Sequence, residues 1–277
     1  MTETRFEFGE NWKSFLRHLD EDRIDQACRS LGTLTGMDDS LNRPLAGKTF
    51  LDLGSGSGLF SLAAFRMGAQ VVSIDYDPQC VACTDQLRRR ESAPDERWRI
   101  HQGSVLDETL MQSLGSFDIV YSWGVLHHTG QMHRAIDAAT YRVAANGMLA
   151  IAIYNDQGAA SRRWLAIKKT YHRLPKPLRP AWVTMIASWY ESKFALARLA
   201  RGRNPLPFAD WKKKKLDRGM SAWHDWADWV GGLPFEVASP DEIIGRLSKK
   251  GFQVAHQTTV GKGWGCNEFV FRKHQAT

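Results

Sequence analysis

The feature that most constrains the fold is an alternation between residues 48 and 154, where short apolar runs take turns with amphipathic stretches. Four segments with helical spacing lie between these runs. Because strands that alternate with helices form βαβ units, the pattern predicts an α/β fold with a mostly parallel, doubly wound sheet. The apolar runs are residues 49–51, 71–74, 98–100, 117–121 and 148–153.

The segments on either side of this alternation have other patterns. Residues 1–46 carry apolar positions at helical spacing, among them Ile24, Ala27 and Leu31, and we expect Gly32 and Gly36 to break the helix. Residues 252–260 and 268–272 are typical of two strands joined by a glycine-rich loop, which predicts an antiparallel hairpin at the sheet edge. We therefore predict an N-terminal helical segment over 1–46, a Rossmann-like core over 47–156 and completion of the sheet by 236–277.

Residues 157–235 interrupt the sheet pattern, and we predict that they form a helical cap with two helices over residues 162–171 and 181–199. Residues 157–220 hold 16 Lys and Arg against 3 Asp and Glu, while the whole chain has a net charge of only +7. Residues 164–229 hold seven of the eleven tryptophans. A basic insert on a neutral-to-acidic body is unlike a uniformly basic nucleic-acid binder.

The sequence also bears on location and on metal chemistry. No apolar run approaches the ~20 residues of a membrane-spanning helix, and the N-terminus lacks the pattern of a signal peptide. We expect a cytoplasmic protein. Cys80 and Cys83 form a CxxC on an expected helix, but no second pair completes a zinc site. We expect ordinary half-buried thiols and no metal.

A glycine-rich turn follows the first apolar run, with Asp52 leading into Gly54, Gly56 and Gly58. Such a turn between a strand and a helix lets backbone N–H groups approach a ligand, although it also occurs as a plain tight turn. A dinucleotide fingerprint requires a third glycine at the position of Leu59, so the spacing is DxGxGxG instead.

Asp75 ends the second apolar run, 21 residues after Gly54. An acid at this strand tip is placed to accept hydrogen bonds from both hydroxyls of a ribose. The alternative is a solvated acid that begins the turn before Asp77. Together the loop and Asp75 predict a site for a nucleoside-like ligand.

These motifs, with Gly103-Ser104-Val105 and the run 117–120, resemble the successive motifs of class I SAM-dependent methyltransferases (SAM, S-adenosylmethionine), chiefly the ubiquinone-type or small-molecule group. The resemblance covers residues 48–154 well and the last two strands loosely. It implies a seven-stranded sheet with a reversed last hairpin, SAM as cofactor and S-adenosylhomocysteine as product.

The resemblance also implies a set of cofactor-binding residues. The three glycines of the turn would approach the methionine part of SAM, Asp75 would bind the ribose and Tyr76 would flank the adenine. The family often has an acid after the position of Gly103, where this chain has Ser104, and the nearest acid is Asp107. The predicted cofactor set is Asp52, Gly54, Ser55, Gly56, Gly58, Asp75, Tyr76, Gly103, Ser104, Val105 and Trp123.

The segment after the fourth run, residues 122–129, ends at the carboxyl edge of the predicted sheet, where open α/β folds place ligands. Trp123 is expected to border the sulfonium and the methyl group. His127 and His128 are the obvious proton acceptors, with an ordinary pKa near ~6.5 that suits a general base. We favour His128 over His127, and the alternative is that both are structural.

Four residues are predicted to bind the acceptor. Tyr154 and Asn155 end the fifth apolar run, where an ordinary turn is the alternative. Trp223 and His224 lie in a Trp-rich stretch, where packing of the cap is the alternative. The predicted function is methyl transfer to an oxygen of a small or lipid-linked, ring-bearing or sugar-like molecule.

Other functions stay open at this point. A nucleic-acid methyltransferase, acting on RNA, could use the basic insert as a phosphate grip. A SAM-binding regulatory protein without catalysis would keep the same loop. Peripheral contact with a membrane surface is a further option for the basic insert, and the sequence predicts no oligomeric state.

Overall fold

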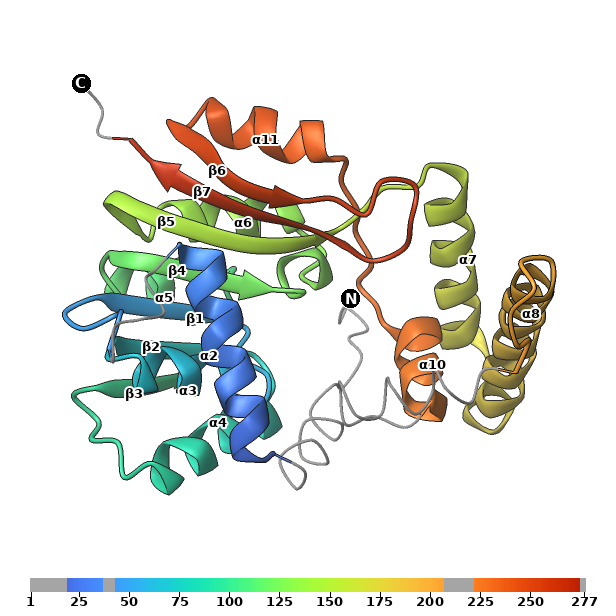
Figure 1. Cartoon of the computed structure of the whole chain (residues 1–277), viewed down its shortest axis with the longest axis horizontal. Helices are drawn as coiled ribbons and strands as arrows, with labels where there is room; N and C mark the ends of the chain where they lie inside the picture. The colour runs from blue at the N-terminus through green and yellow to red at the C-terminus, as the bar shows by residue number, and fades with distance from the viewer. Residues whose placement is uncertain (1–18, 37–42, 207–221, 275–277) are drawn as a thin grey trace. The chain divides into compact units, whose positions relative to one another are not determined.

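A computed structural model describes residues 19–36, 43–206 and 222–274. It contains one seven-stranded sheet in the order β3-β2-β1-β4-β5-β7-β6 (Figure 1). The first five strands pair in parallel, and β7 runs antiparallel to both β5 and β6. The predicted sheet with its reversed last hairpin is therefore confirmed. The strands are β1 (Thr49–Leu53), β2 (Gln70–Asp75), β3 (Trp98–Gln102), β4 (Phe117–Trp123), β5 (Val143–Tyr154), β6 (Phe252–Thr258) and β7 (Cys266–Lys273).

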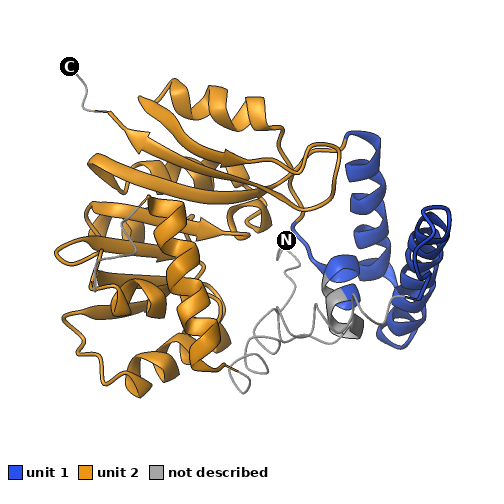
Figure 2. Ribbon diagram, viewed as in Figure 1, with its two compact units in different colours: residues 1–6, 158–234 blue, residues 7–157, 235–277 orange. Residues whose placement is uncertain are grey.

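The chain divides into two compact units, shown in different colours in Figure 2. One unit comprises residues 7–157 and 235–277 and holds the sheet, so we call it the sheet unit. The other comprises residues 1–6 and 158–234, and its described part is helical, so we call it the helical unit. The helices of the sheet unit are α2 (Glu21–Thr35), α3 (Leu59–Arg66), α4 (Pro78–Arg90), α5 (Glu108–Ser113), η1 (Leu126–His128), α6 (Met132–Thr140) and α11 (Pro240–Ser248). Those of the helical unit are α7 (Ala159–Arg173), η2 (Lys176–Leu178), α8 (Arg179–Leu199) and α10 (Ala222–Gly231).

The sheet is buried on both faces, as expected for parallel strands covered by helices. Successive side chains of a strand point to opposite faces. On β1, Leu51 and Leu53 belong to one apolar cluster, which includes residues of α6 and α11. Phe50 belongs to a second cluster on the other face, with residues of α2 and α3. Asp52 shares the face of Phe50 and therefore points towards α3.

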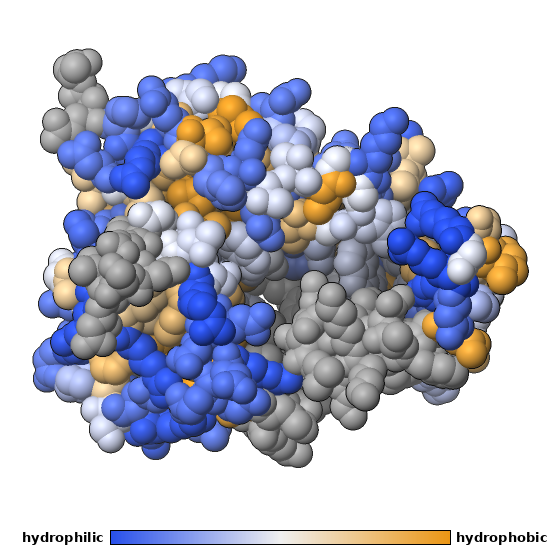
Figure 3. All heavy atoms as spheres, in the orientation of Figure 1, coloured by the Kyte–Doolittle hydropathy of each residue, from blue (hydrophilic) through white to orange (hydrophobic). Residues whose placement is uncertain are grey.

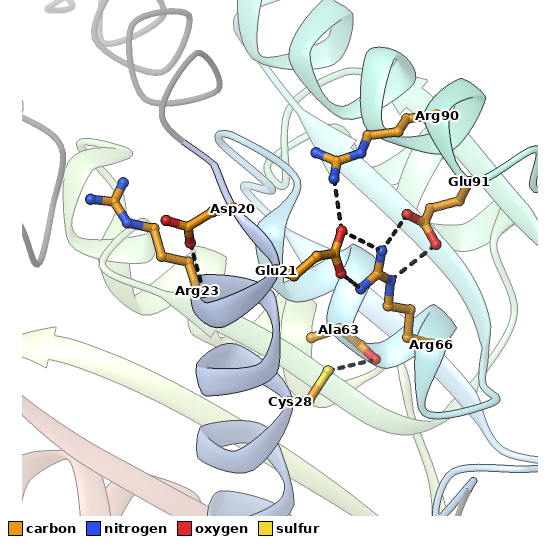
Figure 4. A network of polar contacts seen from close by, with 8 residues as sticks. All are labelled: Asp20, Glu21, Arg23, Cys28, Ala63, Arg66, Arg90 and Glu91. Carbon is orange, nitrogen blue, oxygen red and sulfur yellow. Dashed lines mark hydrogen bonds and ion pairs between the residues drawn. The ribbon is translucent and has the colours of Figure 1, made fainter.

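Helix α2 covers the second cluster and is tied to α3 and α4 by ion pairs (Figure 4). The guanidinium of Arg66 donates to both carboxylate oxygens of Glu91, at 3.0 and 2.7 Å, and also pairs with Glu21. Arg90 donates to the same Glu21 at 2.8 Å. The cation of Arg66 holds the pKa of Glu21 below its usual range. These contacts fix the first turn of α2 to the ends of two neighbouring helices.

The prediction that Gly32 breaks the first helix is wrong. The helix α2 continues through Gly32 and ends at Gly36, whose backbone is left-handed with φ 64°. Gly32 is buried, and α2 packs against α3. Packing of the helix therefore outweighs the low helix propensity of one glycine.

The expectation of half-buried thiols is also wrong for Cys80 and Cys83. Both lie on α4, as predicted, but each is almost fully buried. Burial raises the pKa of the Cys80 thiol well above its ordinary value. These side chains act as small apolar groups under the helix.

Candidate functional site

The order of the strands reverses direction between β1 and β4, because β2 and β3 lie on one side of this pair and β5 lies on the other. Open α/β sheets bind ligands at such a switch point, outside the carboxyl ends of the strands. Two of the predicted segments lie there. The glycine turn follows β1 directly, and the segment from Trp123 to Thr129 follows β4.

The glycine turn needs residues without a side chain at two positions for reasons of packing. The backbone of Gly54 has φ 80°, and a Cβ atom on it would lie 2.4 Å from Cγ1 of Val125. Gly58 has φ 83°, and its Cβ would lie 2.9 Å from Cα of Thr84 on α4. Ser55 lies in the turn, with its hydroxyl 3.0 Å from that of Thr84. The turn is therefore held closely between α4 and the segment after β4.

Asp75, at the tip of β2, holds the glycine turn from the other side. One carboxylate oxygen accepts a hydrogen bond from the backbone N–H of Gly56 at 2.8 Å, and the other accepts from that of Asp77 at 2.9 Å. Burial raises the pKa of Asp75, and the two backbone donors oppose this shift. Each oxygen of an ionised carboxylate has capacity for a further donor. The proposed contact of Asp75 with a ribose stays a prediction, as does that of the exposed Tyr76 with the adenine.

Asp52 is fully buried at the end of β1, under the glycine turn. Its carboxylate accepts a hydrogen bond from the hydroxyl of Ser61 at 2.5 Å. The hydroxyls of Ser61 and Ser73 are 2.7 Å apart, and the indole N–H of Trp98 donates to Ser73 at 2.8 Å. Because the indole can only donate, the bonds run in one direction, from Trp98 to the carboxylate.

Burial raises the pKa of Asp52 to about 7, and the negative charge of Asp75 adds to this rise while the Ser61 hydroxyl opposes it. Ser61, Ser73 and Trp98 were not predicted as partners of Asp52. They lie on three different elements, and no short motif joins them. A direct contact of Asp52 with a cofactor stays a prediction.

The turn after β3 is joined to the tip of β2. The N–H of Gly103 donates to the backbone oxygen of Asp75 at 2.9 Å. A Cβ atom on Gly103 would lie 2.2 Å from Cδ2 of Leu110, so a side chain here would require the end of Leu110 to move. Val105 is buried and belongs to the first apolar cluster.

Ser104 and Asp107 shape the same turn through their side chains. The hydroxyl of Ser104 accepts from the N–H of Leu106 at 3.1 Å. The carboxylate of Asp107 accepts from the N–H of Leu110 at 3.1 Å and thereby caps α5. Helix capping alone accounts for an acid at this position, without a ligand. A contact of Asp107 with the amino group of an adenine stays a prediction.

The two adjacent histidines have different surroundings. His127 is fully buried, its ring lies 3.9 Å from that of Tyr154, and the N–H of Tyr154 donates to its Nδ1 at 3.4 Å. His128 is half-buried, and its ring meets Tyr154 edge-on at 5.3 Å. The geometry gives His127 a packing contact with the end of β5 and leaves His128 the more accessible of the two. The role of either as a base stays a prediction.

Glu236, which was not predicted as a site residue, fixes this histidine segment. Its carboxylate accepts from the N–H of Met132 at 3.1 and 3.0 Å, at the start of α6. An acid at a helix N-terminus is favoured by the helix dipole. The N–H of Glu236 also donates to the backbone oxygen of His127 at 3.0 Å. Glu236 is 109 residues from His127, so only the fold brings them together.

Trp123 ends β4 and stacks on Tyr121, with ring centroids 5.5 Å apart and an angle of 4° between the planes. Both side chains lie on the face of the second apolar cluster. Burial raises the pKa of Tyr121 well above its ordinary value. Trp123 is therefore rigidly placed at the carboxyl edge, and its proximity to a methyl donor stays a prediction.

Asn155 is buried, and its side-chain amide holds the β6–β7 loop. It donates to the backbone oxygen of Gly261 at 2.8 Å and accepts from the amide of Asn267 at 3.0 Å. These contacts engage both the nitrogen and the oxygen of its side-chain amide. Contact of Asn155 with a methyl acceptor stays a prediction. Trp223 and His224 begin α10, but their side chains lie outside the described residues.

Comparison with known proteins agrees with this geometry. Residues 51–149 match the family described as a methyltransferase domain. The chain is 28% identical over 166 residues to the ubiquinone biosynthesis O-methyltransferase of Rhizobium rhizogenes, which covers 56% of this chain and 62% of that protein. It is 33% identical over 120 residues to the protein of the same name from Paramagnetospirillum magneticum, covering 43% of this chain and 46% of that protein. The chain thus spans less than two thirds of these relatives.

Among solved structures, PKMT2 from Rickettsia typhi in complex with AdoHcy (S-adenosylhomocysteine) superposes with a TM-score of 0.54 at 13% identity, over 90% of this chain and 52% of that one. At this identity the likeness concerns the fold alone. Residues 51–149 thus match the methyltransferase domain family, and the sheet has the seven strands and the reversed last hairpin that the resemblance to class I methyltransferases implies.

Proposed function

We propose that this protein transfers a methyl group from SAM to an oxygen of a small or lipid-linked, ring-bearing or sugar-like molecule. The observation that supports this most is the meeting of three features at the switch point of the sheet. These are the glycine turn, the carboxylate of Asp75 bound to that turn, and the segment with His127 and His128 after β4. The Val125 side chain, which packs against Gly54, joins the first of these features to the third.

The chemistry of the residues fits SAM. When bound, SAM supplies a methyl group on a positively charged sulfur, and a cation of this kind is favoured near carboxylates. Asp52 and Asp75 provide two at the ends of neighbouring strands. The left-handed backbone of Gly54, Gly56 and Gly58 leaves the inner edge of the turn free of side chains.

The protein's share in such a reaction is chiefly alignment and exclusion of water. Transfer forms a bond between the acceptor oxygen and the methyl carbon and breaks the methyl–sulfur bond, whose electron pair returns to sulfur. The glycine turn and Asp75 fix one reactant at the carboxyl edge. His128, the more accessible histidine, accepts the proton of the acceptor hydroxyl in this proposal.

The choice of oxygen is supported by the two relatives, which are both O-methyltransferases by name. Their acceptor is not carried over, because the chain spans only part of their length.

The proposal is tested in two steps with the full chain. Calorimetric titration with S-adenosylhomocysteine measures the donor site, and formation of that product from SAM with a panel of phenols, catechols and sugars measures transfer. Binding without turnover on any acceptor would favour a regulatory protein. Absence of binding, with uptake of a nicotinamide or flavin instead, would overturn the donor assignment.

The proposed base has its own test. The variant His128→Ala should lower turnover by about 10²–10⁴-fold near neutral pH with S-adenosylhomocysteine binding retained, the usual contribution of a general base. His127→Ala should mainly lower stability, because His127 is buried against Tyr154. Full turnover by His128→Ala would rule out the base role.

A further inference from the structure

Helix α8 carries a row of exposed apolar side chains along one side. Leu178, which directly precedes α8, and Met185, Trp189 and Leu196 on α8 are between 52% and 66% exposed. They are separated by seven, four and seven residues, and these intervals return to the same side of a helix with 3.6 residues per turn. We call these four residues the apolar stripe. Figure 3 shows apolar atoms beside strongly hydrophilic ones over α8.

The apolar stripe is not the side by which α8 packs in the helical unit. That side is formed by Val183 and Ile186, which are buried, and by Tyr190, whose ring stacks on Trp164 of α7 at 5.0 Å. On a helical wheel these buried residues lie between about 80° and 140° from the centre of the stripe. The helix α8 is therefore apolar on two sides, and within the described residues only one of them is covered.

The chain segment that carries the apolar stripe is strongly basic. Residues 158–206 contain eleven Lys and Arg and a single acid, Glu191. Lys193 lies one turn from Trp189, with its ammonium 4.9 Å from the centre of that ring. Arg201 and Arg203 follow the end of the helix and are exposed. Tryptophan is enriched at membrane interfaces, and cations beside an apolar row meet the headgroups of anionic lipids.

Charge and polarity separate this partner from two others. A second copy of the chain would bring two strongly basic surfaces together, which repel each other. A nucleic acid would engage the Lys and Arg through its phosphates, but it would leave the leucines and Met185 in water. An anionic bilayer meets both the apolar and the basic groups. No helix of the described residues is long and apolar enough to span a membrane, so contact would be at the surface.

We propose that the apolar stripe of α8 docks the protein on the surface of an anionic lipid bilayer, with the stripe in the interface and the neighbouring Lys and Arg at the headgroups.

The test is co-sedimentation of the full chain with vesicles of phosphatidylcholine alone or mixed with phosphatidylglycerol. The protein should bind the mixed vesicles at least tenfold more strongly, since each cation near an anionic surface adds to binding. Lys193→Gln with Arg201→Gln should weaken this binding by on the order of tenfold. Trp189→Ser with Leu196→Ser should weaken it by about tenfold or more, because two large apolar groups leave the interface.

The matched control is Tyr141→Ser with Val254→Ser, which removes two exposed apolar side chains from the sheet unit. The control should bind vesicles like the unchanged protein. Thermal melting and titration with S-adenosylhomocysteine should be the same for all variants, since every changed residue is on the surface. If Trp189→Ser with Leu196→Ser loses vesicle binding but still binds S-adenosylhomocysteine, the loss is due to the apolar stripe.

Three outcomes would overturn the proposal. The first is equal or no binding to the two kinds of vesicle. The second is a dimer of the unchanged protein that becomes a monomer in Trp189→Ser with Leu196→Ser, which would assign the stripe to self-association. The third is loss of binding to a single-stranded RNA in that variant without any vesicle binding. None of these outcomes depends on methyl transfer, so failure here and failure of the proposed function are distinguishable.

Discussion

At the scale of the residue, Asp52 and Asp75 show how two carboxylates on neighbouring strands acquire different properties. Asp75 has a backbone donor on each oxygen, from Gly56 and Asp77. Asp52 is fully buried and accepts from a serine hydroxyl at the end of a one-way line of hydrogen bonds. The charge of Asp75 helps to raise the pKa of Asp52. Asp75 is thus suited to hold the shape of the turn through its hydrogen bonds. The pKa of Asp52 is suited to change with the charge near it.

The variant Asp75→Ala should weaken binding of S-adenosylhomocysteine by about 1.5–3 kcal/mol, the size of hydrogen bonds to a charged group. It removes the acceptor for Gly56 in the turn and the proposed acceptor for a ribose. Calorimetric titration measures the change. Glu96→Ala, which removes an exposed acid before β3, is the control and should bind normally. Unchanged affinity of Asp75→Ala would contradict the donor site.

The raised pKa of Asp52 predicts a dependence of stability on pH. In the folded protein this group has a pKa of about 7, above its ordinary value of 3.8. Between these two pH values the folded state keeps a proton on Asp52 that the unfolded chain has lost. The stabilisation is complete below pH 3.8 and is lost as the pH rises to about 7. The free energy of unfolding, without added SAM, should therefore fall between pH 5 and pH 8.

Asp52→Asn should remove this part of the pH dependence while keeping an acceptor for Ser61. Denaturation by urea at pH 5 and pH 8 gives the change for each protein. The change should be smaller in the variant by a few kcal/mol at most, since each unit of pKa difference corresponds to ~1.4 kcal/mol. Equal changes in the two proteins would show that Asp52 does not have a raised pKa.

At the scale of the element, the site depends on how the turn after β1 packs against the segment after β4. Gly54 and Val125 are in contact across the pair β1–β4, so the position of the histidine segment depends on the absence of a side chain at Gly54. Glu236 then fixes the far end of that segment at the start of α6. The glycine turn and the proposed base, His128, are therefore positioned by the same set of contacts.

Gly54→Ala should be more harmful than Gly115→Ala. Both glycines have φ near 80°, where an alanine is strained by ~1–2 kcal/mol. An added Cβ has open space at Gly115, whereas at Gly54 it meets Val125. Gly54→Ala should lose a further ~1–3 kcal/mol of stability through this overlap, and should bind S-adenosylhomocysteine more weakly. Urea denaturation of both variants gives the comparison, and equal losses would contradict the packing argument.

Local patterns were enough to predict the strands and their parallel pairing. The run at 148–153 is apolar throughout and the run at 71–74 is apolar except for Ser73, as expected for parallel strands buried on both faces. The contacts that shape the site were not predictable in this way. Asn155 binds Gly261, and Glu236 binds Met132, across more than 100 residues. Such pairs form only after the whole sheet has closed, and neither residue stands in a motif with its partner.

At the scale of the whole molecule, the described part of the helical unit is one segment inserted into the chain of the sheet unit. Residues 158–234 leave after β5 and return before α11. The two ends are adjacent within the sheet unit: the N–H of Asp156 donates to the oxygen of Ala238 at 3.1 Å, and the N–H of Ala238 donates to the oxygen of Tyr154 at 3.0 Å. The sheet can therefore close without the inserted segment.

Replacement of residues 158–234 by a short Gly/Ser linker tests the division of labour between the units. The remaining chain should fold and bind S-adenosylhomocysteine as before, because the donor turn, Asp75 and both apolar clusters lie in the sheet unit. Turnover of the acceptor should fall to background. Turnover equal to that of the full chain would place the whole reaction in the sheet unit.

The pairing of Asn155 with Ala238 has a consequence for the evolution of such chains. Lengthening, shortening or exchange of everything between these two residues leaves every strand of the sheet in register. Homologous chains should accordingly vary most in length at this one junction, and acceptor preference should diverge between lineages faster than the loop that receives the nucleoside.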